Sequence, residues 1–210
     1  MESAESEFRK EVARLKPKKI LNIACGVNLK PSFLKDVKAE FFGTDIDKKV
    51  ISGKVKFSDI DKEPIPYPDS SFDLVMTVYS IEHFKTRKVF SEAHRVLKKN
   101  GKFIFITTNF ANPLFLLTKF FKIRKYYYRY EVGFEELYPA YYNTNTPWEV
   151  AKALKKNGFE INEVLFFDRI KGYFKILKTF SELIGILENF FYVLFPEAQP
   201  TMYVVATKIK

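Results

Sequence analysis

The chain has few of the features that would place a protein outside the cytoplasm. Its 210 residues include one cysteine, Cys25, so no intramolecular disulfide can form and nothing requires an oxidising compartment. The first ten residues are charged and lack the apolar core of a signal peptide. The apolar stretch over residues 173–195 is interrupted by two lysines and two glutamates, so it fails as a membrane span. These absences predict a cytoplasmic protein.

The net charge of +10 is not gathered in one basic arm. Residues 1–109 carry +6 and residues 110–210 carry +4. A basic chain can bind nucleic acid, an anionic membrane surface or small anions. Because the excess is spread over both halves and consists mostly of lysine, a solvated surface explains it and nucleic-acid binding is disfavoured. We assign no metal ligands.

What the chain does contain is an alternation of strands and helices. A first helix has Phe8, Val12 and Leu15 on one face and ends before Pro17. Further elements are predicted as strands near 19–25, 40–44, 54–58, 72–78, 102–107, 159–167 and 202–209, and as helices near 86–99 and 147–156. The crossovers before and after the second strand are unusually short. The alternation indicates a doubly wound, mostly parallel α/β sheet in one domain.

Short motifs follow one another in a fixed order. They are ILNIACG at 20–26, FGTDID at 42–47, SDI at 58–60, PYPDSSFDLV at 66–75, IEHF at 81–84 and RVLKKNGKF at 95–103. Together they resemble the class I S-adenosylmethionine-dependent methyltransferases of the small-molecule type, over about half of the chain. The resemblance implies a Rossmann-like seven-stranded sheet with helices on both faces and an antiparallel edge strand. It also implies S-adenosylmethionine as cofactor.

The first motif departs from the family pattern. Ala24, Gly26 and Asn28 stand where the family has three glycines. Alanine keeps the side chain small, and asparagine adopts a positive φ more readily than most residues, so the turn can still form. Asn22 stands where the family usually has Asp or Glu near the cofactor's ammonium group. If Asn22 faces that group, restoring Asp is predicted to tighten cofactor binding.

The resemblance implies further contacts to the cofactor. Asp45 ends the second strand, where its carboxylate can accept hydrogen bonds from both ribose hydroxyls; a simple turn aspartate is the alternative. Asp59 suits the adenine amino group, with helix capping as the alternative, and Ile60 offers an apolar face and a backbone amide. The predicted cofactor-binding residues are Asn22, Ala24, Cys25, Gly26, Asp45, Ile46, Asp59, Ile60, Val78 and Tyr79. Cys25 is also read as a small buried hydrophobe.

Residues after the fourth strand are expected near the transferred methyl group. They are Tyr79, Glu82 and His83. His83 is the candidate catalytic residue, as general base for a hydroxyl acceptor. The alternative is that it only holds the loop or caps the next helix. The second histidine, His94, is predicted to be structural.

The acceptor site is expected outside the shared motifs. Residues 110–142 hold twelve Phe or Tyr among 33 positions, with lysine and arginine interleaved. This composition is too aromatic for a solvated loop, so we predict a lid over the cofactor cleft. Tyr126–Tyr128 could stack on an aromatic ring, a sugar or nucleobases, or pack in the core. The apolar face of residues 173–195 is read as core, as a dimer contact or as a peripheral membrane contact.

The sequence thus predicts one methyltransferase domain over residues 1–210 that methylates a small, sugar-linked or lipid-linked acceptor at oxygen. An RNA methyltransferase is the main alternative, although the Asn-Pro-Pro-Tyr type signature of many amino-group methyltransferases is absent where TVYS stands at 77–80. A non-catalytic binding protein is conceivable because of Asn22 and the missing glycines. The absence of G-x-G-x-x-G after the first strand disfavours a dinucleotide-dependent oxidoreductase. The sequence does not predict an oligomeric state.

Overall fold

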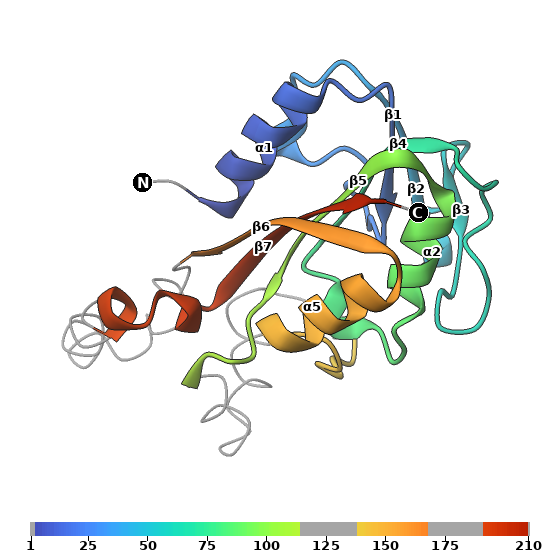
Figure 1. The fold of residues 1–210 in the computed structure, drawn as a ribbon. Coiled ribbons are helices and arrows are strands. Elements are labelled where there is room, and N and C mark those ends of the chain that lie inside the picture. Colours follow the sequence, from blue (N-terminus) through green and yellow to red (C-terminus); the bar gives the residue numbers. More distant parts are fainter. Residues whose placement is uncertain (1–2, 114–137, 168–190, 210) are drawn as a thin grey trace, which may run out of the picture.

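The fold is a seven-stranded sheet with helices on both faces, seen in a computed structural model that describes residues 3–113, 138–167 and 191–209 (Figure 1). The strands are β1 (Lys19–Ile23), β2 (Glu40–Asp45), β3 (Val55–Phe57), β4 (Phe72–Val78), β5 (Leu97–Thr108), β6 (Phe159–Phe167) and β7 (Thr201–Lys208). They lie in the order β3-β2-β1-β4-β5-β7-β6. β7 runs antiparallel to both of its neighbours, and the other pairs are parallel. The predicted fold class is confirmed.

Local signals in the sequence mark where two of the helices begin. The helices placed within the described residues are α1 (Ala4–Leu15), α2 (Lys88–Val96) and α5 (Pro147–Lys156). α1 starts with a capping box between Ser3 and Ser6. α5 starts with a capping box between Thr146 and Glu149, and a proline occupies its first turn, where the missing amide costs nothing.

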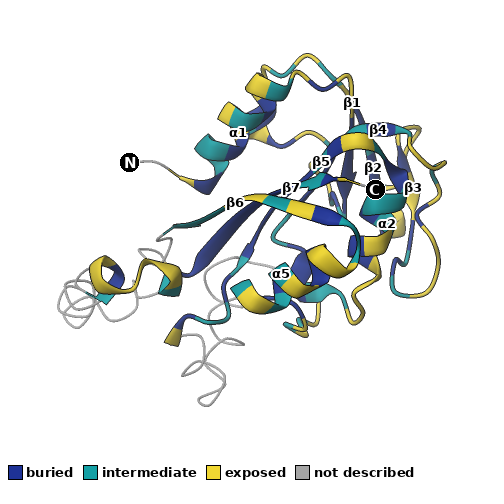
Figure 2. Ribbon diagram, viewed as in Figure 1, coloured by how far each residue is buried: buried dark blue, intermediate teal, exposed yellow. Residues whose placement is uncertain are grey.

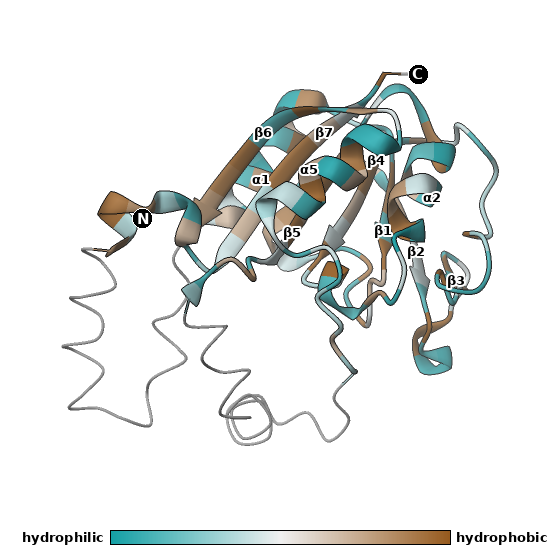
Figure 3. Ribbon diagram, turned by 60° about the horizontal axis from the view of Figure 1, so that its bottom comes forward, coloured by the Kyte–Doolittle hydropathy of each residue, from teal (hydrophilic) through white to brown (hydrophobic). Residues whose placement is uncertain are grey.

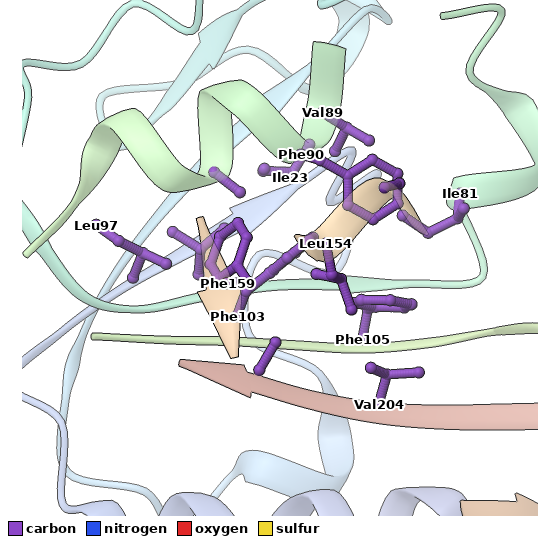
Figure 4. Close-up of a cluster of buried hydrophobic side chains, with 14 of the residues drawn as sticks. Ile23, Ile81, Val89, Phe90, Leu97, Phe103, Phe105, Leu154, Phe159 and Val204 are labelled. Atoms are coloured by element: carbon purple, nitrogen blue, oxygen red, sulfur yellow. The ribbon is translucent and has the colours of Figure 1, made fainter. Parts of the chain in front are cut away.

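Two hydrophobic clusters hold the layers together, one on each face of the sheet. On one face α1 buries Phe8 and Val12 against the strands, as the helical spacing predicts. On the other face Phe90 of α2 and Leu154 of α5 meet phenylalanines of β5 (Figure 4). Figure 2 shows the central strands buried and the outer sides of the helices exposed. Figure 3 shows hydrophobic residues concentrated on the strands and on the inner side of α5.

The crossovers flanking β2 are as short as the sequence indicates. Each contains a single 3₁₀ turn, η1 (Ser32–Leu34) before β2 and η2 (Lys48–Val50) after it. The loops that leave β1 and β2 therefore run directly past the carboxyl edge of the sheet. This edge is where ligands bind in parallel α/β sheets.

One predicted boundary is wrong. The helix expected over 86–99 ends at Val96, because Leu97 pairs with Phe72 of β4 and already belongs to β5. An irregularity follows in which Asn100 takes a positive φ of 63°, and the regular ladder resumes at Lys102. Pairing across the sheet therefore overrides the helical pattern of the RVLKK segment.

Part of the predicted acceptor region lies outside the described residues. This holds for residues 114–137 of the predicted lid, including Tyr126–Tyr128, and for residues 173–190 of the apolar segment. Where residues 191–195 are described, Tyr192 is buried and bonds to Asn112, whereas Val193, Leu194 and Phe195 are exposed. The lid and the role of the apolar segment stay predictions, as does the single domain over 1–210.

Candidate functional site

The loop after β1 reverses the chain through two left-handed residues. Ala24 has a φ of 53° and Gly26 a φ of 54°. Asn28, expected to adopt such a conformation, does not, because the turn is closed by its amide donating to the Cys25 carbonyl at 3.1 Å. A Cβ added to Gly26 would meet no atom within 4 Å. The space beside this turn is therefore open.

Asp45 lies at the end of β2 and joins the loops that follow β1 and β2. Its Oδ2 accepts the Gly26 amide at 2.7 Å, and its Oδ1 accepts the Asp47 amide at 2.8 Å. The residue is 8% exposed. A carboxylate offers about four lone-pair positions, so two acceptor positions remain after these bonds. These two acceptor positions fit the hydroxyl donors of a ribose diol, which the cofactor expected from the motifs carries.

Apolar side chains stand exposed next to this carboxylate. Ile46 is 46% exposed and Val27 is 85% exposed. Ile46 follows Asp45 and Val27 follows Gly26. Asp45 and Gly26 bond to each other at the carboxyl edge of the sheet. An adenine ring needs such an apolar surface, so their position fits an adenosyl group.

Asn22 of β1 is buried, and its side chain is hydrogen-bonded to the loop after β1. Its Nδ2 donates to the carbonyls of Asn28 and Leu29, both at 3.2 Å. Since both partners only accept, the NH₂ group and not the oxygen must point at them. The amide nitrogen therefore holds the loop, which the resemblance to the family did not indicate.

This contact changes the expected effect of Asn22→Asp. The aspartate would place a negative oxygen against two carbonyl oxygens, so we expect a loss of stability of roughly 1–3 kcal/mol and weaker binding of S-adenosylhomocysteine. Urea denaturation and calorimetry measure the two effects. A folded Asn22→Asp protein that binds the ligand more tightly than wild type would show that an ammonium group outweighs the loop contact.

Cys25 is packed beneath β2. It is 7% exposed, and a Cβ on Gly43 would come within 2.7 Å of its Sγ. Burial, with a smaller contribution from the Asp45 charge, raises the pKa of the Cys25 thiol to about 11. The cysteine can therefore contact a ligand in this loop through its backbone, while its side chain fills the core.

The raised pKa predicts an unreactive thiol. At pH 8 we expect Cys25 to react with a disulfide reagent about two orders of magnitude more slowly than a free thiol, because so little thiolate forms. An unfolded thiol ionises near pH 9 whereas the folded one keeps its proton to about 11, so this group lowers stability as the pH rises across that interval. Labelling in native buffer and in urea tests this; equal rates would contradict it.

The loop after β3 offers fewer side-chain groups to a ligand than the sequence suggested. Asp59 pairs with the exposed Lys62 at 2.8 Å, and its carbonyl accepts the amides of a following turn. Ile60 is 5% exposed and belongs to the core, so only its backbone can meet a ligand. The buried Ser58 hydroxyl has no hydrogen-bond partner among the described residues, and the Ser58 amide donates to the Asp45 carbonyl. Sequence reasoning missed Ser58 as a ligand-binding candidate.

The loop after β4 turns sharply at Tyr79. This residue has a φ of 51°, and its amide donates to the Ile106 carbonyl at 2.7 Å. The side chains of Val78 and Tyr79 pack against the cluster beneath α1. Both residues can therefore approach the cofactor mainly through the backbone.

His83 lies in η3 (Ile81–His83) and contacts a segment that is distant in sequence. Its Nδ1 is 3.0 Å from the Pro139 carbonyl. A carbonyl only accepts, so Nδ1 carries the proton and Nε2 is the basic nitrogen of the neutral ring. Glu82, also expected near the methyl group, accepts hydrogen bonds from the Thr107 and Thr108 hydroxyls at the end of β5 through its carboxylate.

Two features are absent from the residues that the structure describes. No group of three or more His, Cys, Asp or Glu side chains is placed to hold a metal ion. In the same ranges, no helix has the length and hydropathy needed to cross a bilayer.

Known proteins are similar to this chain in sequence and in architecture. The family description "Methyltransferase domain" matches residues 21–105. The "Demethylmenaquinone methyltransferase" of Thermotoga maritima is 28% identical over 198 residues, which covers 81% of this chain and 84% of that protein. The "Probable tocopherol O-methyltransferase, chloroplastic" of Oryza sativa is 29% identical over 109 residues, 45% of this chain and 30% of that longer protein.

A solved structure supports the fold independently. A SAM-dependent methyltransferase from Archaeoglobus fulgidus superposes with a TM-score of 0.64 at 19% identity, covering 97% of this chain and 92% of that one. The matched residues 21–105 run from β1 to β5 and thus include the loops that surround Asp45. Since the matched domain and the sheet order agree, this chain is an S-adenosylmethionine-dependent methyltransferase with the class I fold.

Proposed function

We propose that the chain transfers a methyl group from S-adenosylmethionine to a hydroxyl group of a small, lipid-linked or sugar-linked acceptor. The observation that carries the cofactor part is the Asp45 carboxylate, which holds the Gly26 loop and keeps two acceptor positions for a ribose diol. The names of the two relatives above refer to demethylmenaquinone and tocopherol, which favours a lipid-type acceptor.

The roles of the side chains follow from this proposal. S-adenosylmethionine supplies the methyl group on a sulfonium sulfur. Asp45 binds the ribose and Ile46 packs on the adenine. His83 takes the acceptor's hydroxyl proton at Nε2, with Nδ1 held by the Pro139 carbonyl. Positioning and the exclusion of water supply the rest of the acceleration.

Calorimetry with S-adenosylhomocysteine tests the cofactor part. We expect binding by the wild-type protein and none of NAD. The absence of heat with S-adenosylhomocysteine, together with binding of NAD, would overturn the proposal while leaving the fold unaffected.

A labelling experiment tests the acceptor part. Methyl-labelled S-adenosylmethionine is incubated with demethylmenaquinol, with a tocopherol carrying a free ring hydroxyl, and with bulk tRNA; we expect label in the organic phase. Label in RNA, with affinity that falls steeply with salt, would favour the RNA alternative, since several phosphates would then be neutralised. Binding of S-adenosylhomocysteine without transfer to any acceptor would favour a non-catalytic protein.

A further inference from the structure

Residues 138–146, here called the strap, are fastened along the loop that carries His83. Besides the bond from His83 to Pro139, the amides of Tyr141 and Tyr142 donate to the Glu82 carbonyl at 2.7 and 3.2 Å. The strap's Asn143 side chain donates to the Lys85 carbonyl at 2.8 Å. These bonds place the strap beside the proposed general base.

Glu82 is a buried carboxylate whose hydrogen-bond partners, within the described ranges, are neutral hydroxyls. It is 5% exposed, and its two oxygens accept the hydroxyls of Thr107 at 2.9 Å and Thr108 at 2.8 Å. Among the described residues, no lysine, arginine or histidine forms an ion pair with it. Burying a charge without a cationic partner costs free energy, so the position of the Glu82 carboxylate indicates a structural or chemical role.

The hydrogen bonds around Glu82 have one possible direction. Asn145 of the strap donates through Nδ2 to the Thr107 hydroxyl at 2.7 Å and to the Thr108 carbonyl at 3.1 Å. Because Thr107 receives this proton, its own hydroxyl proton must go to Glu82. A directed chain therefore runs from Asn145 through Thr107 to Glu82 and connects the strap to the end of β5.

The backbone carbonyl of Glu82 also holds the strap, at the residue where the strap's backbone is strained. Tyr142 has a φ of 53°, a conformation that costs a non-glycine residue free energy, and its amide bonds to the Glu82 carbonyl. The Tyr142 ring stacks on Phe110 with centroids 4.5 Å apart and planes inclined by 19°. The Phe110 amide in turn donates to the Asn145 carbonyl at 2.8 Å.

We propose that Glu82 is a positioning residue: it holds the strap against the end of β5, and the strap's Pro139 carbonyl fixes the His83 tautomer. The inference rests on the proposed role of His83. For this positioning role, the two acceptor oxygens of Glu82 matter more than its negative charge. A glutamine retains one acceptor for Thr107 and can donate to the Thr108 hydroxyl, so Glu82→Gln preserves both side-chain bonds to β5. Glu82→Ala removes these bonds and keeps only the backbone carbonyl that accepts the Tyr141 and Tyr142 amides.

Nitrogen NMR of ¹⁵N-histidine-labelled protein is the test, with His94→Gln used to assign the two rings. Above the pH at which imidazole titrates, we expect wild type and Glu82→Gln to show one His83 tautomer with Nδ1 protonated. In Glu82→Ala we expect exchange between both tautomers, and amide hydrogen exchange at Tyr141 and Tyr142 at least tenfold faster.

Controls keep the outcome decisive. Glu160→Ala removes an exposed glutamate of β6 and is expected to behave as wild type. If Glu82→Ala does not fold, Thr108→Val removes one of its two side-chain bonds and takes its place. A wild-type tautomer and wild-type exchange in the folded variant, or a Glu82→Gln protein that behaves like Glu82→Ala, would overturn the proposal. Calorimetry with S-adenosylhomocysteine on the wild type reports separately on the proposed function.

Discussion

Replacing Asp45 with alanine is expected to weaken S-adenosylhomocysteine binding by about 100-fold, or about 3 kcal/mol. Asp45 is buried and accepts the Gly26 and Asp47 amides, so the variant loses the proposed ribose acceptor and leaves two amides without their carboxylate. Calorimetry gives the affinity, and thermal unfolding shows whether the protein remains folded.

Asp47→Ala is the matched control for this experiment. Asp47 is also an aspartate in the loop after β2, but its carboxylate accepts the Lys49 amide and caps η2. We expect its affinity to stay within about threefold of wild type, since alanine keeps the backbone amide that bonds to Asp45 and loses only the half-buried side chain that caps η2. Equal losses in both variants would mean that loop order, and not the Asp45 carboxylate, carries the binding.

Replacing Arg95 with methionine is expected to lower the free energy of unfolding by about 2–4 kcal/mol. Arg95 of α2 donates to Glu92 and Asp69, and to the carbonyls of Ile65 and Tyr67. Methionine fills a similar volume but leaves these acceptors without a donor. The guanidinium side chain is 27% exposed, so solvent offsets part of the loss. Urea denaturation measures the change.

Lysine cannot fully replace Arg95, because it lacks the planar, forked guanidinium group. Arg95→Lys keeps the charge but can reach fewer of the acceptors that the guanidinium joins, so we expect a loss between that of Arg95→Met and zero. A methionine variant within about 0.5 kcal/mol of wild type would show that the loop before β4 does not depend on this residue. The contact also joins two of the motifs in space, because Arg95 of the RVLKK segment bonds to Tyr67 and Asp69 of the PYPDSSFD segment.

The candidate cofactor site illustrates how far sequence reasoning reaches. Asp45 could be placed because a carboxylate directly after a parallel strand lies at the ligand edge. The roles of Asn22 and Ile60 could not, because the direction of a side chain depends on its neighbours. Asn22 meets carbonyls of a loop six and seven residues further along, and Ile60 turns into the core.

The sequence by itself determined the order of strands and helices, the ends of α1 and α5, and the family, because these depend on periodicity, capping residues and motifs read over short distances. Only the tertiary structure decided that α2 stops at Val96, where Leu97 joins the sheet opposite Phe72. It also decided that the Glu82 carboxylate accepts a hydroxyl from Thr107, 25 residues further along the chain. Both outcomes depend on contacts between distant residues, whose free energy outweighs the local preference that a sequence pattern reports.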